Sequence, residues 1–238
     1  MNSIQTIPFT QLIFSFIPVL VVIYVIFRWG LNYSNAIYAL TRMLIQLLLI
    51  GYILTFIFES NSVWIITGVL IVMVLFSSWI ALNNQSVDRK FLFKYSLLAI
   101  LIGAVTTLGF IILGVLDLQP WYSASYLIPL AGMIFANSMN SVSLAAERLG
   151  SEIDSGLSYQ AARNIAFNAS LIPIINSLFA VGLVSLPGMM TGQILSGVSP
   201  FIAARYQIMV MCMIFGSAGL SSACFLTFAR AFFIEKVK

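Results

Sequence analysis

Seven apolar stretches alternate with short polar stretches along this chain of 238 residues. Each apolar stretch is close to the ~20 residues that an α-helix needs to cross a bilayer. They predict membrane-spanning helices over residues 11–27, 36–58, 63–82, 95–116, 124–146, 166–184 and 206–229. The polar intervals are too short for a separate soluble domain. We therefore expect an all-α, polytopic membrane protein with one transmembrane domain over residues 1–238.

Composition supports this class and excludes others. Hydrophobic residues make up 61% of the chain and charged residues 8%, whereas a soluble domain carries roughly 25% charged residues. The basic residues are scattered singly between apolar stretches, so the net charge of +4 does not indicate a nucleic-acid partner. Two cysteines and no histidine argue against a disulfide framework or a zinc site.

The basic residues predict the orientation, because they gather on the cytoplasmic side of membrane proteins. With seven spans and the N-terminus outside, Arg205 is the single basic residue on the outer side. Ten then lie inside: Arg28, Arg42, Arg89, Lys90, Lys94, Arg148, Arg163, Arg230, Lys236 and Lys238. An eighth span over 186–204 would leave eight inside and three outside. Seven spans with the N-terminus out and the C-terminus in fit better.

The longest uncharged stretch runs over 41 residues, from Asn164 to Ala204, and is about twice as long as one span. Pro187, Gly188 and Gly192 interrupt it, and they suit a continuous helix poorly. Broken helix at membrane depth is tolerated only against protein or a water-filled cavity. Residues 185–205 are therefore predicted to form a gate or re-entrant turn at the outer side. A short apolar surface loop is the alternative.

Polar side chains line one stripe of the predicted helix 124–146. The stripe comprises Met133, Asn137, Asn140, Ser141 and Leu144, spaced by four, three, one and three residues. Two asparagines on one face indicate either a substrate pathway or hydrogen bonds between helices. Asn168 and Asn176, eight residues apart in 166–184, have the same two interpretations.

Small residues mark the last predicted span. Ser217 and Ser221, Ala218 and Ser222, and Gly219 and Ala223 are pairs with the spacing that lets two helix backbones approach closely. These pairs predict a packing face, within the subunit or across a dimer.

No catalytic machinery is apparent. All seven acidic residues lie at the ends of spans or between them, and the chain has no P-loop sequence GxxxxGK[ST]. We expect no catalytic residues and no cofactor in this chain. If it pumps, another subunit supplies the energy.

Five segments form an ordered set that resembles a known family. They are IPLAGMI over 128–134, NSMN over 137–140, LIPIINS over 171–177, VGLVSLPGMMTG over 181–192 and ARYQIM over 204–209. The set is similar to the FetB-type ABC transporter permeases, described as iron exporters in bacteria and related to plant aluminium-tolerance proteins. The resemblance is strong over 126–222 and collinear before that.

The resemblance implies a permease that works as a homodimer in the plasma membrane. Its partner would be a separate cytoplasmic ATP-binding subunit that holds ATP and magnesium. The interval 147–163, cytoplasmic in the predicted topology, is the expected coupling loop, with a short helix in the cleft of that subunit. Its contact residues would be Glu147, Arg148, Glu152, Gln160 and Arg163. Many relatives have a longer loop before the match to Gln160 and Ala161.

The substrate stays open at this point. The candidate pathway residues are Asn137, Asn140, Asn176, Met133, Met189, Met190 and Gln193. Free iron prefers carboxylate or imidazole ligands, whereas thioethers suit softer metals. A metal complex or a small polar solute fits this set as well as iron does. An ATP-independent channel or carrier and a non-transporting scaffold are the other functional classes.

Overall fold

A computed structural model describes residues 7–59, 62–83 and 89–235. These residues form helices, and the remaining backbone pairing within them is an isolated bridge between Val181 and Ser185. The prediction of an all-α fold is confirmed. The chain divides into two compact units, and the first contains residues up to 60 together with Leu195–Gly197.

The first unit is a helical hairpin. It consists of α1 (Phe9–Leu12), the 3₁₀ turn η1 (Ile13–Ser15), α2 (Phe16–Arg28) and α3 (Tyr33–Glu59). Gly30, with φ of 70°, turns the chain between α2 and α3, and the Phe27 and Tyr33 rings meet edge to face at 5.6 Å. No residue of α2 is buried. An apolar helix exposed in this way needs lipid or another protein around it.

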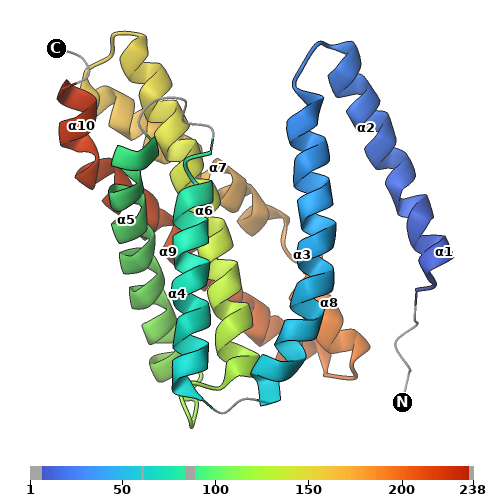
Figure 1. Cartoon of the computed structure of the whole chain (residues 1–238). Helices are drawn as coiled ribbons and strands as arrows, with labels where there is room; N and C mark the ends of the chain where they lie inside the picture. Colours follow the sequence, from blue (N-terminus) through green and yellow to red (C-terminus); the bar gives the residue numbers. More distant parts are fainter. Residues whose placement is uncertain (1–6, 60–61, 84–88, 236–238) are drawn as a thin grey trace. The chain divides into compact units, whose positions relative to one another are not determined.

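The second unit contains the remaining helices. They are α4 (Val63–Ile80), α5 (Arg89–Gly109) with the π-helical turn η2 (Phe110–Val115), α6 (Ala124–Asp154), α7 (Tyr159–Ala180), α8 (Gly188–Leu195), α9 (Pro200–Phe228) and α10 (Arg230–Glu235). Consecutive long helices run in opposite directions (Figure 1). α9 packs against α5, α6 and α7, and α6 also packs against α4.

Small residues allow these helices to approach closely. A Cβ atom on Gly103 of α5 would lie 2.2 Å from Ser221 Oγ and 2.9 Å from the Ser217 carbonyl oxygen of α9. Ser217, Ala218, Ser221 and Ser222 are all buried. Two of the three predicted small-residue pairs on this helix are therefore confirmed as a packing face within the subunit, whereas Ala223 of the third pair is exposed.

Six helices are long and apolar enough to cross a membrane by length and composition, among the residues that the structure describes. They match six of the seven predicted spans, and the exception is 166–184, which falls on α7. α7 has 22 residues and is about 33 Å long, enough for a hydrocarbon core of about 30 Å. Its polar residues, among them Asn164, Asn168 and Asn176, lower its hydropathy. The count of seven therefore depends on α7.

The basic residues of the second unit gather at one of its ends. This end contains the start of α5, the turn between α6 and α7, and α10 (Figure 1). The residues are Arg89, Lys90, Lys94, Arg148, Arg163 and Arg230, whereas Arg205 lies near the start of α9 at the opposite end. Lys236 and Lys238 lie outside the described residues. The asymmetry agrees with the predicted topology, and the orientation in the membrane stays a prediction.

Candidate functional site

The first group of predicted pathway residues lies on the exposed side of α6. Asn140 is exposed, and Met133 and Asn137 are half-buried. The Asn137 side-chain amide donates a hydrogen bond of 2.8 Å to the Met133 carbonyl oxygen, which leaves its own amide oxygen free to accept one. An exposed face with two asparagines is poorly suited to lipid. It requires water or a polar partner.

Ser141 does not belong to this face, which corrects the predicted stripe. It is buried, donates a hydrogen bond of 2.9 Å to the Ser170 carbonyl oxygen of α7, and accepts one of 2.9 Å from Ser222 of α9. Asn140 and Ser141 are consecutive, so about 100° of helix rotation separates them. That rotation places Ser141 in the contact between α6, α7 and α9, where it joins the three helices.

The two asparagines of α7 are also exposed. Asn168 and Asn176 lie two turns apart on that helix. The hydrogen bond from Ser141 to Ser170 places the middle of α6 beside the middle of α7. The asparagines of both helices therefore lie at the central depth of the second unit, where polar side chains mark functional surfaces more often than elsewhere.

The chain between α7 and α9 forms a tight turn followed by the short helix α8. Gly182, with φ of 85°, permits a hydrogen bond of 3.0 Å from its own amide to the Ser185 carbonyl oxygen. α8 is about 12 Å long, too short to cross a bilayer. It ends at Leu195, and the chain then turns at Gly197, with φ of 90°, where the Val198 amide donates to the Gln193 carbonyl oxygen.

The predicted gate residues surround the start of α8. Pro187 precedes this helix, Gly188 begins it and Gly192 lies in its second turn. The Thr191 amide and hydroxyl both donate to the Pro187 carbonyl oxygen, at 3.0 and 3.2 Å. The glycines and proline thus start a helix and do not interrupt one. Whether the segment 185–205 re-enters the membrane stays a prediction.

The side chains of α8 reach a pocket of about 350 Å³ beside α9. Met190 lines it, together with the turn at Val181 and five residues of α9, among them Gln207, Met211 and Cys212. Met189 and Gln193 are half-buried, and the amide oxygen of Gln193 has no hydrogen-bond partner among the described residues. Sequence reasoning missed the residues of α9. Gln207, Met211 and Cys212 are spaced by four and one residues, and a glutamine inside an apolar span is unusual. This pattern in the sequence could have identified them.

The interval 147–163 differs from the expected loop with a short transverse helix. α6 continues to Asp154, and only 155–158 separate it from α7. The turn is closed by Gly156, with φ of 87°, and the Leu157 amide donates to the Glu152 carbonyl oxygen. The Ser158 hydroxyl then caps α7 by accepting from the Ala161 amide at 3.4 Å. The result is a firm helical hairpin.

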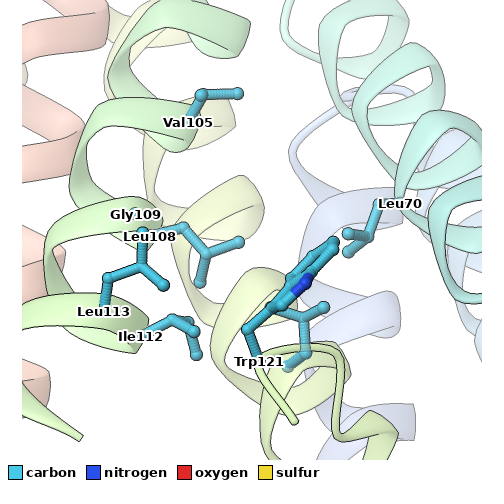
Figure 2. A pocket seen from close by; sticks show the side chains of 8 residues that line it. Leu70, Val105, Leu108, Gly109, Ile112, Leu113 and Trp121 are labelled. Carbon is cyan, nitrogen blue, oxygen red and sulfur yellow. The ribbon is translucent and has the colours of Figure 1, made fainter. Parts of the chain in front are cut away.

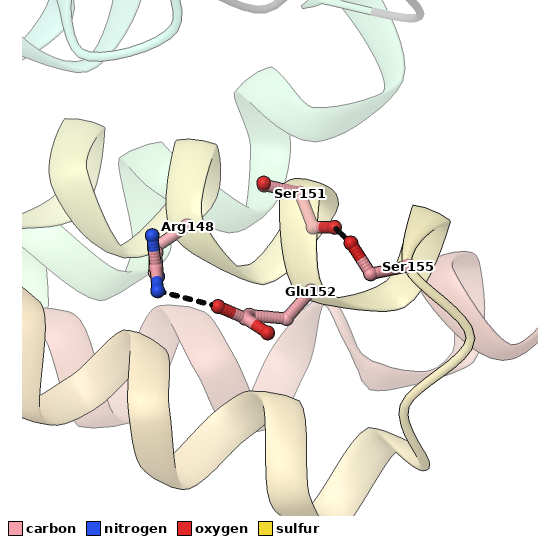
Figure 3. Close-up of polar contacts among 4 residues, drawn as sticks. All are labelled: Arg148, Ser151, Glu152 and Ser155. Atoms are coloured by element: carbon pink, nitrogen blue, oxygen red, sulfur yellow. Dashed lines mark hydrogen bonds and ion pairs between the residues drawn. The ribbon is translucent and has the colours of Figure 1, made fainter.

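Two of the predicted coupling residues form an ion pair on this hairpin. The Arg148 guanidinium lies 2.6 Å from the Glu152 carboxylate, one helical turn away (Figure 3). Glu147, Gln160 and Arg163 are exposed nearby in sequence. α6 is about 46 Å long, about 16 Å more than the hydrocarbon core. The helix is therefore long enough for its charged last turns to extend beyond the bilayer.

Tyr159 fastens the hairpin to the end of α9. Its hydroxyl donates a hydrogen bond to the Leu226 carbonyl oxygen, and the Arg230 guanidinium lies 5.9 Å from its ring centre. Burial raises the pKa of the Tyr159 phenol, which Arg163 and Arg230 partly offset. The phenol stays protonated at neutral pH and remains a donor. Motion of the hairpin is therefore mechanically connected to α9.

A second pocket, of about 390 Å³, is apolar throughout. It lies between α4, α5 and the turn before α6, where Trp121 faces Leu70 and Leu108 (Figure 2). The pocket contains no charged group. It suits hydrocarbon, and its chemistry does not suit a metal ion or a polar solute.

Hard-metal ligands do not come together in the described part of the chain. No three residues among histidine, cysteine, aspartate and glutamate are grouped closely enough to hold a metal ion there.

Comparison with known proteins places this architecture in a family. The model of the Uncharacterised protein family (UPF0014) matches residues 9–233. The chain belongs to the UPF0014 family. The match includes α8, the α6–α7 hairpin and the exposed asparagines, so every candidate surface described above is part of the family's common region.

Relatives of this UPF0014 protein occur in bacteria and plants. "UPF0014 membrane protein slr1647" of Synechocystis is 37% identical over 82% of each chain. "Probable iron export permease protein FetB" of Escherichia coli is 35% identical, over 83% of this chain and 81% of its own. "Protein ALUMINUM SENSITIVE 3" of Arabidopsis thaliana is 34% identical, over 86% and 80%. The resemblance found in the sequence is confirmed. No solved structure matches the chain.

Proposed function

We propose that this UPF0014 protein is the membrane permease of an ATP-driven exporter and that its substrate is a metal, with iron as the first candidate. A homodimer in the plasma membrane would work with a separate cytoplasmic ATP-binding subunit, which holds ATP and magnesium. The observation that carries the proposal is the match along both units to the Escherichia coli protein named as a probable iron export permease. The helices long and apolar enough to cross a membrane support the transport class.

The α6–α7 hairpin is the contact that we assign to the ATP-binding subunit. It extends beyond the bilayer, carries the Arg148–Glu152 ion pair and has its turn fixed by Gly156 and Ser158. A firm element can transmit motion, and Tyr159 connects this one to α9. Exposed Glu147, Gln160 and Arg163 supply the polar rim that protein interfaces use.

The exposed asparagines of α6 and α7 are the pathway surface in this proposal. Amide oxygens can replace water around a cation or hydrogen-bond a metal complex, and they carry no charge that would hold it permanently. Asn137, Asn140 and Asn176 would supply these oxygens. Two copies of the chain would enclose the face and keep it away from lipid.

The test begins with purification of the tagged chain from cells that express it. We expect an ATP-binding protein to co-purify, and charge reversal by Arg148→Glu with Arg163→Glu to release it. In vesicles that contain both subunits, Asn137→Leu with Asn140→Leu should stop ATP-dependent iron efflux without releasing the partner. Ser125→Ala, at the start of α6, is the control. Iron flux through this chain alone, without ATP, would instead make it a channel or carrier.

A further inference from the structure

The pocket between α7, α8 and α9 brings sulfur atoms from distant parts of the sequence together. Met190 comes from α8, and Met211 and Cys212 are neighbours in the middle of α9. Cys212 is a free thiol at the surface of α9, and no described residue covers its side chain. The rest of the lining is aliphatic apart from Gln207. Thioethers and a thiol are the ligand types that soft cations prefer.

Gln207 indicates independently that a ligand belongs in this pocket. Its side chain is 5% exposed, it lines the pocket, and its amide oxygen has no hydrogen-bond partner in the described residues. An unsatisfied buried acceptor costs about 1–3 kcal/mol. The lining residues offer no strong hydrogen-bond donor, because their side chains are aliphatic, thioether or thiol. A bound cation would satisfy the oxygen.

We propose that this pocket binds a soft monovalent cation of the Cu(I) and Ag(I) class. The two thioethers and the Cys212 thiolate are the ligands, and the Gln207 oxygen is the fourth donor. This site goes beyond the proposed export function and does not depend on it, since binding needs no ATP-binding subunit.

Charge balance selects a monovalent ion. Binding releases the Cys212 thiol proton to solvent, so one thiolate neutralises one positive charge and the occupied pocket is neutral. A divalent ion would leave a net charge in an apolar environment, which is costly. Met211 is buried and Met190 half-buried, so both thioethers are already mostly out of water before the ion arrives.

The experiment uses the purified full-length chain in detergent micelles, titrated with Ag⁺ and, under reducing anaerobic conditions, with Cu⁺ against a chromophoric chelator. We expect about one ion per chain and release of about one proton per ion. X-ray absorption of the copper form should show sulfur as the main neighbour. Met211→Leu and Cys212→Ser should each weaken binding by at least about tenfold, and Cys212→Ser should abolish proton release.

Matched controls are Met189→Leu, adjacent to Met190 on α8, and Cys224→Ser, the other cysteine of α9. Neither residue lines the pocket. Leucine keeps the volume of methionine, so the metal-free thermal midpoint of the two Met→Leu variants should be close to that of the parent chain. Binding that falls equally in the controls, or that is as weak in the parent chain as in Cys212→Ser, would overturn the proposal. Neither result would change the proposal of iron export with an ATP-binding subunit, because that proposal is tested separately.

Discussion

α3 in the first unit and α9 in the second are alike in length and apolar composition but differ in what covers them. They contain 27 and 29 residues. Half of the most apolar window of α9 is buried, but almost none of that window in α3 is, where Ile57 is buried at one end. Hydropathy therefore identifies both as membrane helices and does not say which one packs against protein.

The difference lies in the small residues. α9 contains Ser217, Ala218, Ser221 and Ser222 on its buried side, and Gly103 of α5 fits against them. The exposed surface of α3 is made of large side chains, among them Leu48 and Tyr52. In lipid, close backbone approach and hydrogen bonds hold helices together, because apolar side chains gain nothing by leaving hydrocarbon for protein. Three comparisons between the units test this explanation, and a fourth, within α6, measures the effect of a surface charge for contrast.

The largest effect is expected at Gly103. Gly103→Ala would place a methyl group against Ser221 Oγ and the Ser217 backbone, and overpacking of this kind costs about 1–3 kcal/mol. The free energy of unfolding, measured by titration with a denaturing detergent, should fall accordingly. Gly51→Ala in α3 has open space at the same atom and should lose no stability. Equal losses at both glycines would contradict the explanation.

The serine that joins three helices comes next. Ser141→Ala removes two interhelical hydrogen bonds, each worth about 0.6 kcal/mol in membrane proteins, so a loss of roughly 1 kcal/mol is expected. The same detergent titration measures it. Thr55→Ala in α3 is the control, because the Thr55 hydroxyl donates only to Gly51 of its own helix. A larger loss of stability in Thr55→Ala than in Ser141→Ala would contradict the explanation that contacts between helices stabilise the second unit.

A somewhat smaller loss is expected at the base of the hairpin. Tyr159→Phe removes the hydrogen bond to the Leu226 carbonyl oxygen, with a cost of about 0.5–1 kcal/mol. Tyr52→Phe, on the exposed surface of α3, should be neutral. Hydrogen exchange at the start of α7 should rise in Tyr159→Phe alone. Unchanged exchange there would mean that the tyrosine does not fasten the hairpin.

The smallest effect is expected at the charged end of α6. Glu152→Gln breaks the ion pair with Arg148 and should cost about 0.3–0.5 kcal/mol, as exposed pairs one turn apart do. About 1 M salt should remove the difference from the parent chain. Glu147→Gln is the control, because Glu147 has no ion-pair partner in the part of the chain that the structure describes. A loss that salt does not change would rule out an electrostatic cause.

The sequence predicted the helical spans well because hydropathy averaged over a span depends little on the details of packing. The predictions from sequence were wrong where side-chain packing or helix geometry determines the structure. The predicted stripe on α6 includes one residue too many, Ser141. Adjacent positions on a helix point to different faces, and the hydrogen-bond partners of Ser141 lie on α7 and α9. The sequence predicts a loop with a short helix over 147–163, because the apolar stretch before it ends at residue 146. α6 instead continues through Glu147, Arg148 and Glu152.

The pocket was predicted only in part for a related reason. Met190 was named from its unusual sequence surroundings, but Gln207 and Met211 are distant from it in the chain and belong to another helix. A single sequence shows which residues share a face of one helix, but it does not show which faces of different helices pack against each other. Gly103 was missed in the same way, although Ala99 and Gly103 have the spacing of a small-residue face.

Arg89 gives the second unit a fixed reference point for depth. Its guanidinium lies 4.0 Å from the centre of the Trp79 ring, and it donates hydrogen bonds to the Trp79 carbonyl oxygen at the end of α4. Tryptophan and arginine both favour the headgroup region. Because the two are held together, they cannot adjust to membrane thickness independently. We therefore expect the end of α4 and the start of α5 to keep a common depth in bilayers of different thickness.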